Sequence, residues 1–281
     1  MSVRRSPTVG RRRLGLELRR LREASGLTIE MVADRLECSS SKISRIETGH
    51  TGVTPRDVRD MLAVYGLRGP AADELVQVAR DARQKGWWHL YGTVLTGAYV
   101  GLEAAASSIR SYEVQVIPGL LQTETYARNM LQAGGPGRSE TEVDRRVHVR
   151  MARQSLLVQD DPLDLWVVLD ETIFYRLVGG SAVMREQLNH LVRSSARPNV
   201  TIQVLPFSAG AHVAMEGSFT ILGYDEPADP DVVFAENAAG GLFLEKDEEL
   251  QRYHYIFDHL RATAMPPEES VAFIAARVKE L

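Results

Sequence analysis

The sequence predicts an α plus α/β protein of two domains: an all-helical bundle of five helices over residues 1–84 and a mixed α+β domain over residues 85–281. A chain of 281 residues is long enough to bury two separate cores. Apolar residues recur at helical spacing in the first part, whereas the second part combines helical segments with short β-branched runs. The net charge also differs in sign between the first part of the chain and the rest. Residues 1–66 hold 13 Lys or Arg and 8 Asp or Glu, a net +5, which leaves −9 for the remainder of a chain that totals −4.

The composition is typical of a globular protein, with 44% hydrophobic and 25% charged residues. No apolar run approaches the ~20 residues that cross a membrane, so we expect no membrane contact. The stretch from Met1 to Arg13 is rich in arginine and lacks the apolar centre of a secretory signal, which predicts a cytoplasmic protein. The single cysteine, Cys38, excludes an internal disulfide and a multi-cysteine zinc site.

The first two helices are predicted from apolar spacing and from signals at their ends. Leu14, Leu18 and Leu21 recur at helical spacing among charged residues, and Gly26 stops this helix. Thr28 then caps a second, short helix. The buried stripe of the second helix is predicted to contain Met31, Val32, Ala33 and Leu36.

Three further helices complete the bundle. Ser39 caps the third helix, Ile43 and Ile46 point inward, and Gly49 ends it in a left-handed conformation. The fourth helix starts at Thr54 and Pro55 and ends before Gly66, and its inner face contains Val58, Met61, Leu62 and Tyr65. Pro70 opens a fifth helix over residues 71–83, with Leu75, Val78 and Ala82 inward.

The third helix carries the predicted function. Two short helices joined by so tight a turn form a helix-turn-helix, and the helix from Ser39 to Thr48 then presents its first turn to the major groove of double-stranded DNA. The side chains placed to reach base edges are Ser40, Ser41, Ser44 and Arg45, and those placed for phosphates are Thr28, Ser39 and Lys42. The alternative is a small helical bundle whose serines serve only as caps and whose arginines form a solvated face.

Arg45 is the strongest candidate for reading a base. A guanidinium can form two hydrogen bonds to guanine, which is worth about 1–3 kcal/mol of discrimination, whereas a serine hydroxyl bonds several bases and discriminates weakly. The sequence therefore predicts that DNA specificity depends on few residues.

The segment LRRLREASGLTIEMVADRLECSSSKISRIETG, residues 18–49, resembles the Cro/cI, or XRE, class of helix-turn-helix proteins. The resemblance covers nearly the whole N-terminal module and implies a five-helix Cro/cI-type bundle. In two places the sequence departs from the class. Ile29 stands where the class usually has a glutamine that touches the DNA backbone, and Glu37 replaces the usual glycine of the turn. A left-handed Glu37 would cost roughly 1 kcal/mol. Cys38 is predicted to pack at the turn as a small residue.

The boundary between the domains is predicted at residues 84–88, GlnLysGlyTrpTrp, where Gly86 breaks the fifth helix. Trp87, Trp88 and Tyr91 are predicted to pack one domain on the other. A ligand cage and stacking on bases are the alternatives.

The second domain is predicted to combine helices with a mixed sheet. Segments of helical composition are residues 104–110, 123–131, 140–158, 184–193, 248–262 and 268–279. Runs typical of strands are residues 165–169, 200–205, 219–222, 232–234 and 242–244. The helix between the first two strands predicts a parallel βαβ unit, and the close spacing of the later runs predicts antiparallel hairpins.

No catalytic residue, cofactor site or metal site is predicted. Asp170 and Glu171 are adjacent carboxylates at a strand end, but neighbours in a strand point to opposite faces. The seven histidines include no pair with metal-ligand spacing on one helical face, and no nucleophile elbow or phosphate-binding glycine loop is present. His212, in the loop PheSerAlaGlyAlaHis, is the most site-like histidine, although a plain connecting loop is the favoured interpretation.

The second half is similar to the C-terminal domain of the actinobacterial WhiJ-like regulators, which are described as antitoxin-like. The matching stretches include VQVIPGLLQTETYAR at residues 114–128 and RPNVTIQVLPFSAGAH at residues 197–212, together with residues 84–88, 183–188 and 219–222. The resemblance implies a regulator, rather than an enzyme, whose C-terminal domain binds a small partner protein that is often encoded beside it.

Three hypotheses follow from the sequence. The first is a transcriptional regulator without a cofactor. It forms a homodimer that places its recognition helices in two half-sites about 34 Å apart, and a partner protein changes its affinity for DNA. The second hypothesis keeps DNA binding but makes the C-terminal domain a sensor of a small molecule near the loop that ends at His212. A DNA-tethered hydrolase ranks last, because it needs clustered acids or bases that the sequence does not supply.

Overall fold

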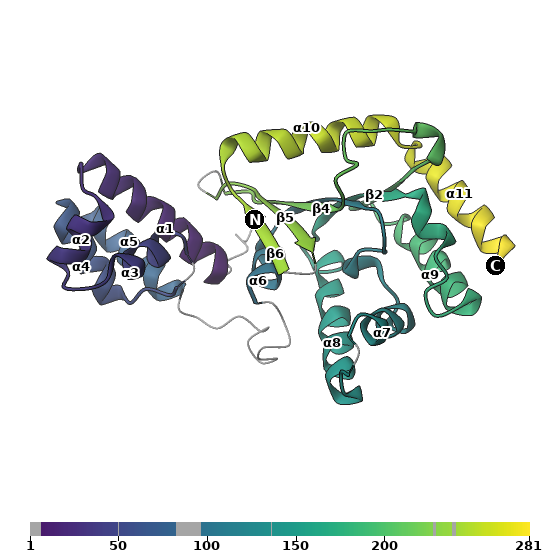
Figure 1. Cartoon of the computed structure of the whole chain (residues 1–281), viewed down its shortest axis with the longest axis horizontal. Coiled ribbons are helices and arrows are strands. Elements are labelled where there is room, and N and C mark those ends of the chain that lie inside the picture. Colours follow the sequence, from purple (N-terminus) through teal and green to yellow (C-terminus); the bar gives the residue numbers. More distant parts are fainter. Residues whose placement is uncertain (1–6, 50, 83–96, 136, 227–228, 238–239) are drawn as a thin grey trace. The chain divides into compact units, whose positions relative to one another are not determined.

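The computed structural model describes residues 7–49, 51–82, 97–135, 137–226, 229–237 and 240–281, which form two compact units (Figure 1). The first unit contains α1 (Pro7–Ala24), α2 (Ile29–Arg35), α3 (Ser40–Glu47), α4 (Pro55–Tyr65), α5 (Pro70–Asp81) and α6 (Gly97–Ala105). The second unit extends from residue 106 to residue 281. The predicted boundary at residues 84–88 lies outside the described residues, as do Trp87, Trp88 and Tyr91.

The five predicted helices of the N-terminal bundle are confirmed, and their apolar faces meet in one core. Leu14, Leu18 and Val32 are fully buried, and Ile43 and Met61 are almost so. Burial of these side chains on four different helices supplies most of the free energy that holds such short helices together, since helices of 7 or 8 residues are unstable alone.

The buried face of α5 differs from the prediction. Val76, Ala79 and Ala82 are buried, whereas Leu75 and Val78 only pack partly against the core. Helix α5 packs against both α4 and α1, and Val76 and Ala79 are the residues that face the core these helices share.

The turn between α2 and α3 contains the expected backbone strain. Glu37 has a φ of 50°, in the left-handed region, and is the only described non-glycine residue with a positive φ. Its N–H donates to the carbonyl of Asp34, and the N–H of Cys38 donates to that of Ala33. These two hydrogen bonds are the Schellman pattern that usually ends in glycine.

The second unit is built around one six-stranded sheet, whose mixed character was predicted and whose strand β1 was not. In spatial order the strands are β3 (Val200–Leu205), β2 (Asp164–Asp170), β1 (Ser108–Glu113), β4 (Phe219–Gly223), β5 (Val232–Asn237) and β6 (Gly240–Leu244). The first three of these run parallel to one another, and β4, β5 and β6 pair antiparallel. The helix α9 (Ser181–Ser194) connects β2 to β3, which confirms the βαβ unit.

The prediction of a helix at residues 104–110 is wrong. Helix α6 ends at Ala105, and residues 108–113 form β1, which lies in the middle of the sheet between β2 and β4. Ile109 and Tyr112 are three residues apart, as on a helix, and both are buried, but they are buried on opposite faces of the sheet. Pairing with two neighbouring strands overrides the local pattern here.

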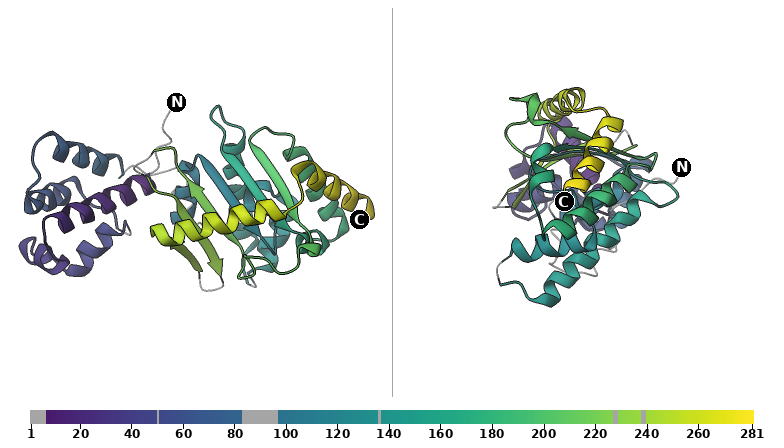
Figure 2. Two further views of the ribbon diagram at one scale, coloured as in Figure 1. Left: turned by 90° about the horizontal axis from the view of Figure 1, so that it is seen from above. Right: turned by 90° about the vertical axis from the view of Figure 1, so that its right-hand side faces the viewer.

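Helices cover both faces of the sheet (Figures 1 and 2). On one face lies α10 (Asp247–Thr263), whose Phe257 and Leu260 pack with Tyr112 and Val168. On the other lie α9, α7 (Glu124–Ala133) and α8 (Glu140–Arg153), which continues into the short helix η3 (Gln154–Leu157). The last helix, α11 (Pro267–Glu280), packs against α9 and β3.

Among the helices of the described ranges, none is both long and apolar enough to cross a membrane.

Candidate nucleic-acid interface

The predicted recognition helix is α3, and the residues before it set its starting point. Ser39 is its N-cap, and its hydroxyl oxygen accepts a hydrogen bond of 3.2 Å from the N–H of Lys42. Thr28 caps α2 in the same way, accepting from the N–H of Met31 at 3.2 Å. The hydroxyl proton of Ser39 is left to donate, which is what a phosphate oxygen requires. The hydroxyl of Thr28 instead donates to the carboxylate of Glu30, and this hydrogen bond helps to lower the pKa of Glu30.

The outward face of α3 carries the residues that were predicted to reach bases. Ser40, Ser41 and Arg45 are exposed, whereas Ser44 is half-buried. The guanidinium of Arg45 makes no hydrogen bond or ion pair with any residue that the structure describes. Its five donors are therefore available to an incoming ligand.

Lys42, predicted to contact a phosphate, is tied to α4. Its Nζ lies 2.8 Å from Oδ1 of Asp57, and this contact raises the pKa of Lys42. Asp57 in turn belongs to the capping box of α4, together with Thr54. A phosphate at Lys42 would have to share the ammonium with this carboxylate, which reduces the expected gain from that contact.

A buried ion pair that sequence reasoning missed positions α3 against α1. Arg22 is 8% exposed and Glu47 is 4% exposed. The guanidinium bonds both carboxylate oxygens, with Nε–Oε1 of 2.8 Å and Nη2–Oε2 of 2.9 Å, and its Nη1 donates to the carbonyl of Leu27. A signal was present in the sequence, because Glu47 stands four residues after the inward Ile43 and so falls on the buried face.

The same two helices approach closely at Gly15. A Cβ at this position would lie 2.6 Å from the backbone oxygen of Ile46 and 2.7 Å from that of Glu47. Backbone atoms cannot move aside as a flexible side chain can, so only glycine fits. The orientation of α3 therefore depends on both a glycine contact and an ion pair.

The two departures from the XRE pattern have different places in the structure. Ile29 is partly buried and packs against the core of the first unit, and Cys38 does the same, as predicted for it. Ile29 therefore contributes apolar contact where a glutamine would offer a polar group. Glu37 is exposed at the turn.

The other candidate residues of the sequence have structural partners in the second unit. Asp170 caps the short helix η4 (Glu171–Tyr175) by accepting from the N–H of Thr172, and Glu171 accepts from the N–H of Phe207 at 2.7 Å. Nδ1 of His212 accepts from the N–H of Ala214, and its Nε2 lies 3.3 Å from the hydroxyl of Tyr112. These contacts hold the loops that follow β2 and β3.

A partly buried acid at the end of β1 was not anticipated. Desolvation and the neighbouring Glu236 raise the pKa of Glu113 to about 7, although Ser111 and Ser218 donate hydrogen bonds that favour its charged form. No pattern of spacing marks Glu113, because its environment is assembled from two strands, β1 and β5, and the residue before β4.

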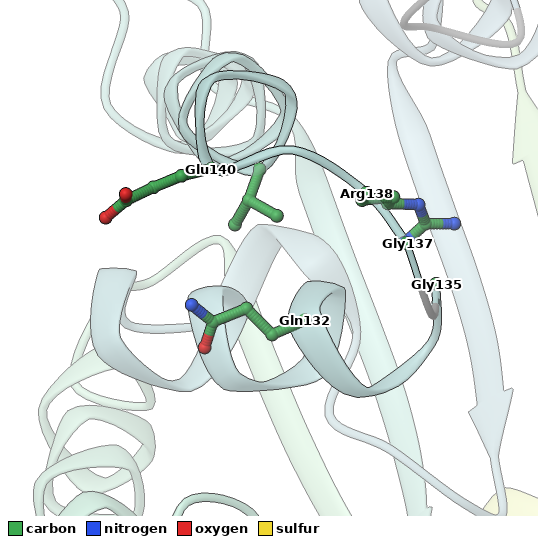
Figure 3. Close-up of a pocket in the computed structure, with 6 residues that line it drawn as sticks. Gln132, Gly135, Gly137, Arg138 and Glu140 are labelled. Carbon is green, nitrogen blue, oxygen red and sulfur yellow. The ribbon is translucent and has the colours of Figure 1, made fainter.

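A surface hollow lies elsewhere, between the end of α7 and the start of α8 (Figure 3). Its lining consists of Gln132, Gly135, Gly137, Arg138, Glu140 and Val143. Gln132 and Glu140 are exposed, so the hollow is open to solvent, and no residue of the loop that ends at His212 lines it. Within the described ranges, no three His, Cys, Asp or Glu side chains gather as a metal site requires.

Two family models match the chain. A helix-turn-helix domain matches residues 13–75, and a domain of unknown function (DUF5753) matches residues 96–276, more than half of the 281 residues. No curated protein and no solved structure matches it. The helix-turn-helix match contains α2, α3 and the turn between them.

Proposed function

This chain belongs to the DUF5753 family and carries a helix-turn-helix domain ahead of that domain, and on this basis we propose that it is a sequence-specific transcriptional regulator. The observation that carries the proposal is the outward face of α3, where the unpaired guanidinium of Arg45 stands beside the exposed Ser40 and Ser41. Arg45 reads a base, and Ser39 holds a phosphate through its free hydroxyl proton. Thr28 holds a second phosphate by exchanging its hydrogen bond to Glu30 for one to the phosphate oxygen.

The assignment of α3 is tested by selecting binding sites from a randomised DNA library. Arg45→Ala should relax base choice at one position of each half-site. Lys42→Ala should lower the affinity for all DNA sequences alike and make that affinity less dependent on salt concentration. The control is Arg80→Ala, which removes an exposed arginine from α5 and should leave the selected sequence unchanged. Binding profiles that are unchanged in both α3 variants would contradict the proposal.

For the second unit we propose that it binds a small partner protein encoded nearby, as the resemblance to WhiJ-like regulators implies. Exposed apolar side chains on the loops after β2 and β3 support this: Tyr175, Leu177, Phe207, Val213 and Met215. The rings of Tyr175 and Phe207 stack at 5.9 Å. Loops at the carboxyl ends of parallel strands meet at one edge of a sheet, which is where such sheets commonly bind ligands. No reaction is assigned to the chain.

The alternative is a small-molecule sensor, and two measurements on the full chain separate it from partner binding. Copurification with the product of an adjacent gene, lost in Phe207→Ser but kept in Tyr255→Ser on α10, supports the partner protein. A rise in melting temperature with a metabolite, in the absence of any protein, supports the sensor instead.

We further propose that the regulator acts as a homodimer, with one recognition helix in each of two half-sites about 34 Å apart. The reason is that a single α3 offers few base contacts. Two copies double the number of contacts, and a partner protein can then change affinity by changing how the copies are held.

A further inference from the structure

The sheet of the second unit has two edges, and one of them is closed. The outer side of β3 is covered by the connection between α10 and α11. There the N–H of Val204 donates to Oγ of Ser270 at 2.9 Å, and the N–H of Met265 donates to the carbonyl of Val204 at 2.9 Å. These bonds satisfy groups that would otherwise be open to another strand.

The opposite edge, β6, is open. On its inner side it pairs with β5 over Gly240–Leu244. On its outer side, no backbone group of these five residues forms a hydrogen bond with any part of the chain that the structure describes. Gly240, Gly241 and Leu242 are exposed, and Leu242 is 54% exposed at the centre of the strand.

The usual protection of an edge strand is missing from β6. Proteins block such edges with charged side chains, with proline or with a bulge. The sequence GGLFL contains no charge and no proline, and its pairing with β5 runs in register from Asn237↔Gly240 to Val233↔Leu244 without a bulge. An uncharged, regular edge with an exposed leucine is suited to accepting a further strand.

We propose that β6 pairs with β6 of a second copy of this chain, antiparallel, about a two-fold axis at Leu242. The inference rests on the dimer of the proposed function and names its contact surface. A two-fold axis between identical strands makes them antiparallel, and a strand without charges opposes no like charges when it meets itself. This self-compatibility favours a second copy over a strand of another protein.

The proposed register has favourable side-chain contacts. Leu242 lies opposite Leu242 of the second copy, which removes both exposed leucines from water. Gly241 lies opposite Phe243 of the second copy, and an aromatic ring across from an edge glycine compensates for the missing side chain. Within the chain a ring already lies over this glycine from a diagonal position. Gly241 pairs with Glu236, and the ring of Phe234, which pairs with Phe243, would lie 2.2 Å from a Cβ at Gly241.

The first test is sedimentation equilibrium of the full chain over a concentration series. Leu242→Lys places two like charges opposite each other at the axis and should raise the dimer dissociation constant by at least roughly tenfold. The matched control, Val158→Lys, changes a valine that is 59% exposed after η3 and lies outside the proposed partner-binding loops, so it should leave the constant unchanged. A monomeric wild-type chain, or a dimer that Leu242→Lys does not weaken, would overturn the proposal.

A second test traps the register. Leu242→Cys in a Cys38→Ser background should form a disulfide-linked dimer under mild oxidation, because directly opposed residues of an antiparallel pair lie close enough for a disulfide. Val158→Cys in the same background should remain monomeric on a denaturing gel. If the wild-type chain is monomeric and pairs through β6 only with another protein, then the proposal that β6 pairs with a second copy of this chain is wrong.

Failure of this proposal is distinguishable from failure of DNA binding. Leu242→Lys should bind a single half-site as the wild type does and lose only its preference for two half-sites. Loss of half-site binding in Leu242→Lys would contradict the assignment of β6 to the dimer. Unchanged DNA recognition by Arg45→Ala would contradict the role of α3 and leave the β6 contact standing.

Discussion

Glu37 occupies a backbone conformation that is taken by glycine at the ends of α1, α3 and α4. Its φ of 50° compares with 67° at Gly26, 69° at Gly49 and 82° at Gly66. At Gly26 and Gly66 the hydrogen bonds are also the same as at Glu37. The N–H of Leu27 donates to the carbonyl of Arg22 and the N–H of Leu67 to that of Leu62, so the same Schellman pattern recurs. A Cβ in this region crowds the following carbonyl, which is a local cost at Glu37 that the core has to offset.

Glu37→Gly is therefore expected to stabilise the protein by about 1 kcal/mol, because the left-handed conformation costs glycine no steric energy. Urea unfolding of the first unit, followed by circular dichroism, measures this. Gly66→Ala is the opposite change at an equivalent helix end and should destabilise by a similar amount. A Glu37→Gly variant that is less stable than the wild type would contradict this reading of the turn.

Glu113 is expected to make stability depend on pH. Its folded pKa of about 7 lies above the ordinary value of 4.5, so the folded state holds this proton more tightly than the unfolded state does. The resulting stabilisation is complete below pH 4.5 and is lost as pH rises to about 7. Glu113→Gln cannot lose a proton, so its stability relative to the wild type should grow across this window.

Chemical denaturation of both proteins at a series of pH values between 4.5 and 8 checks this expectation. Glu236→Gln serves as the second variant, because it removes the neighbouring charge that helps to raise the pKa of Glu113 and should narrow the window. If the free energies of unfolding of the wild type and Glu113→Gln differ by the same amount at every pH, then Glu113 does not have a raised pKa.

At the scale of secondary-structure elements, the contact between α1 and α3 decides where the recognition helix lies. It consists of the Arg22–Glu47 pair at one point and the backbone approach at Gly15 at another. Glu47→Ala should cost about 3–5 kcal/mol, because it removes the carboxylate that bonds the buried guanidinium of Arg22 at two points and leaves only the more exposed Glu23 at 3.4 Å. Thermal unfolding measures the loss, and DNA affinity measured below the transition shows whether α3 has moved.

The double variant Arg22→Met/Glu47→Leu separates charge from packing. It replaces the buried pair by apolar side chains of similar size, which is often neutral or stabilising. Recovery of stability is expected for this variant. If the double variant is as unstable as Glu47→Ala, the destabilisation comes from lost packing between the two side chains and not from an unpaired charge.

Elements with strong local signals were predicted well, and those that depend on distant partners were not. The N-terminal helices have caps at Thr28 and Ser39 and a terminating glycine at Gly26, all short-range features. Strand β1 has no such signal. Its sequence, SIRSYE, contains four polar or charged residues that favour no strand, and only pairing with β2 and β4 makes it one.

For the whole molecule, two recognition helices held in one dimer should require a fixed distance between half-sites. A dimer fits half-sites whose centres are about 34 Å apart, one turn of DNA. Inserting half a turn between them should reduce affinity to that for a single half-site, and a full turn should restore part of it. Gel-shift titration with operators of different spacing tests this, and equal affinity at every spacing would exclude a rigid dimer on DNA.

The charge distribution also acts at this scale. The net +5 of residues 1–66 favours approach to DNA, whereas the net −9 of the remainder opposes contact between the second unit and phosphates. This asymmetry was evident from composition. It predicts which unit meets DNA but not which residues do so.

Local features were sufficient for the five N-terminal helices, the helix-turn-helix, the strained turn at Glu37 and the mixed character of the sheet, because each depends on residues that are close in the chain. Only the tertiary structure placed Lys42 against Asp57, Arg22 against Glu47, and β1 between β2 and β4. It also showed that the outer side of β3 is hydrogen-bonded, whereas the outer side of β6 has no backbone partner among the residues that the structure describes. These features join residues 15 to more than 100 positions apart, and no local periodicity encodes such pairings.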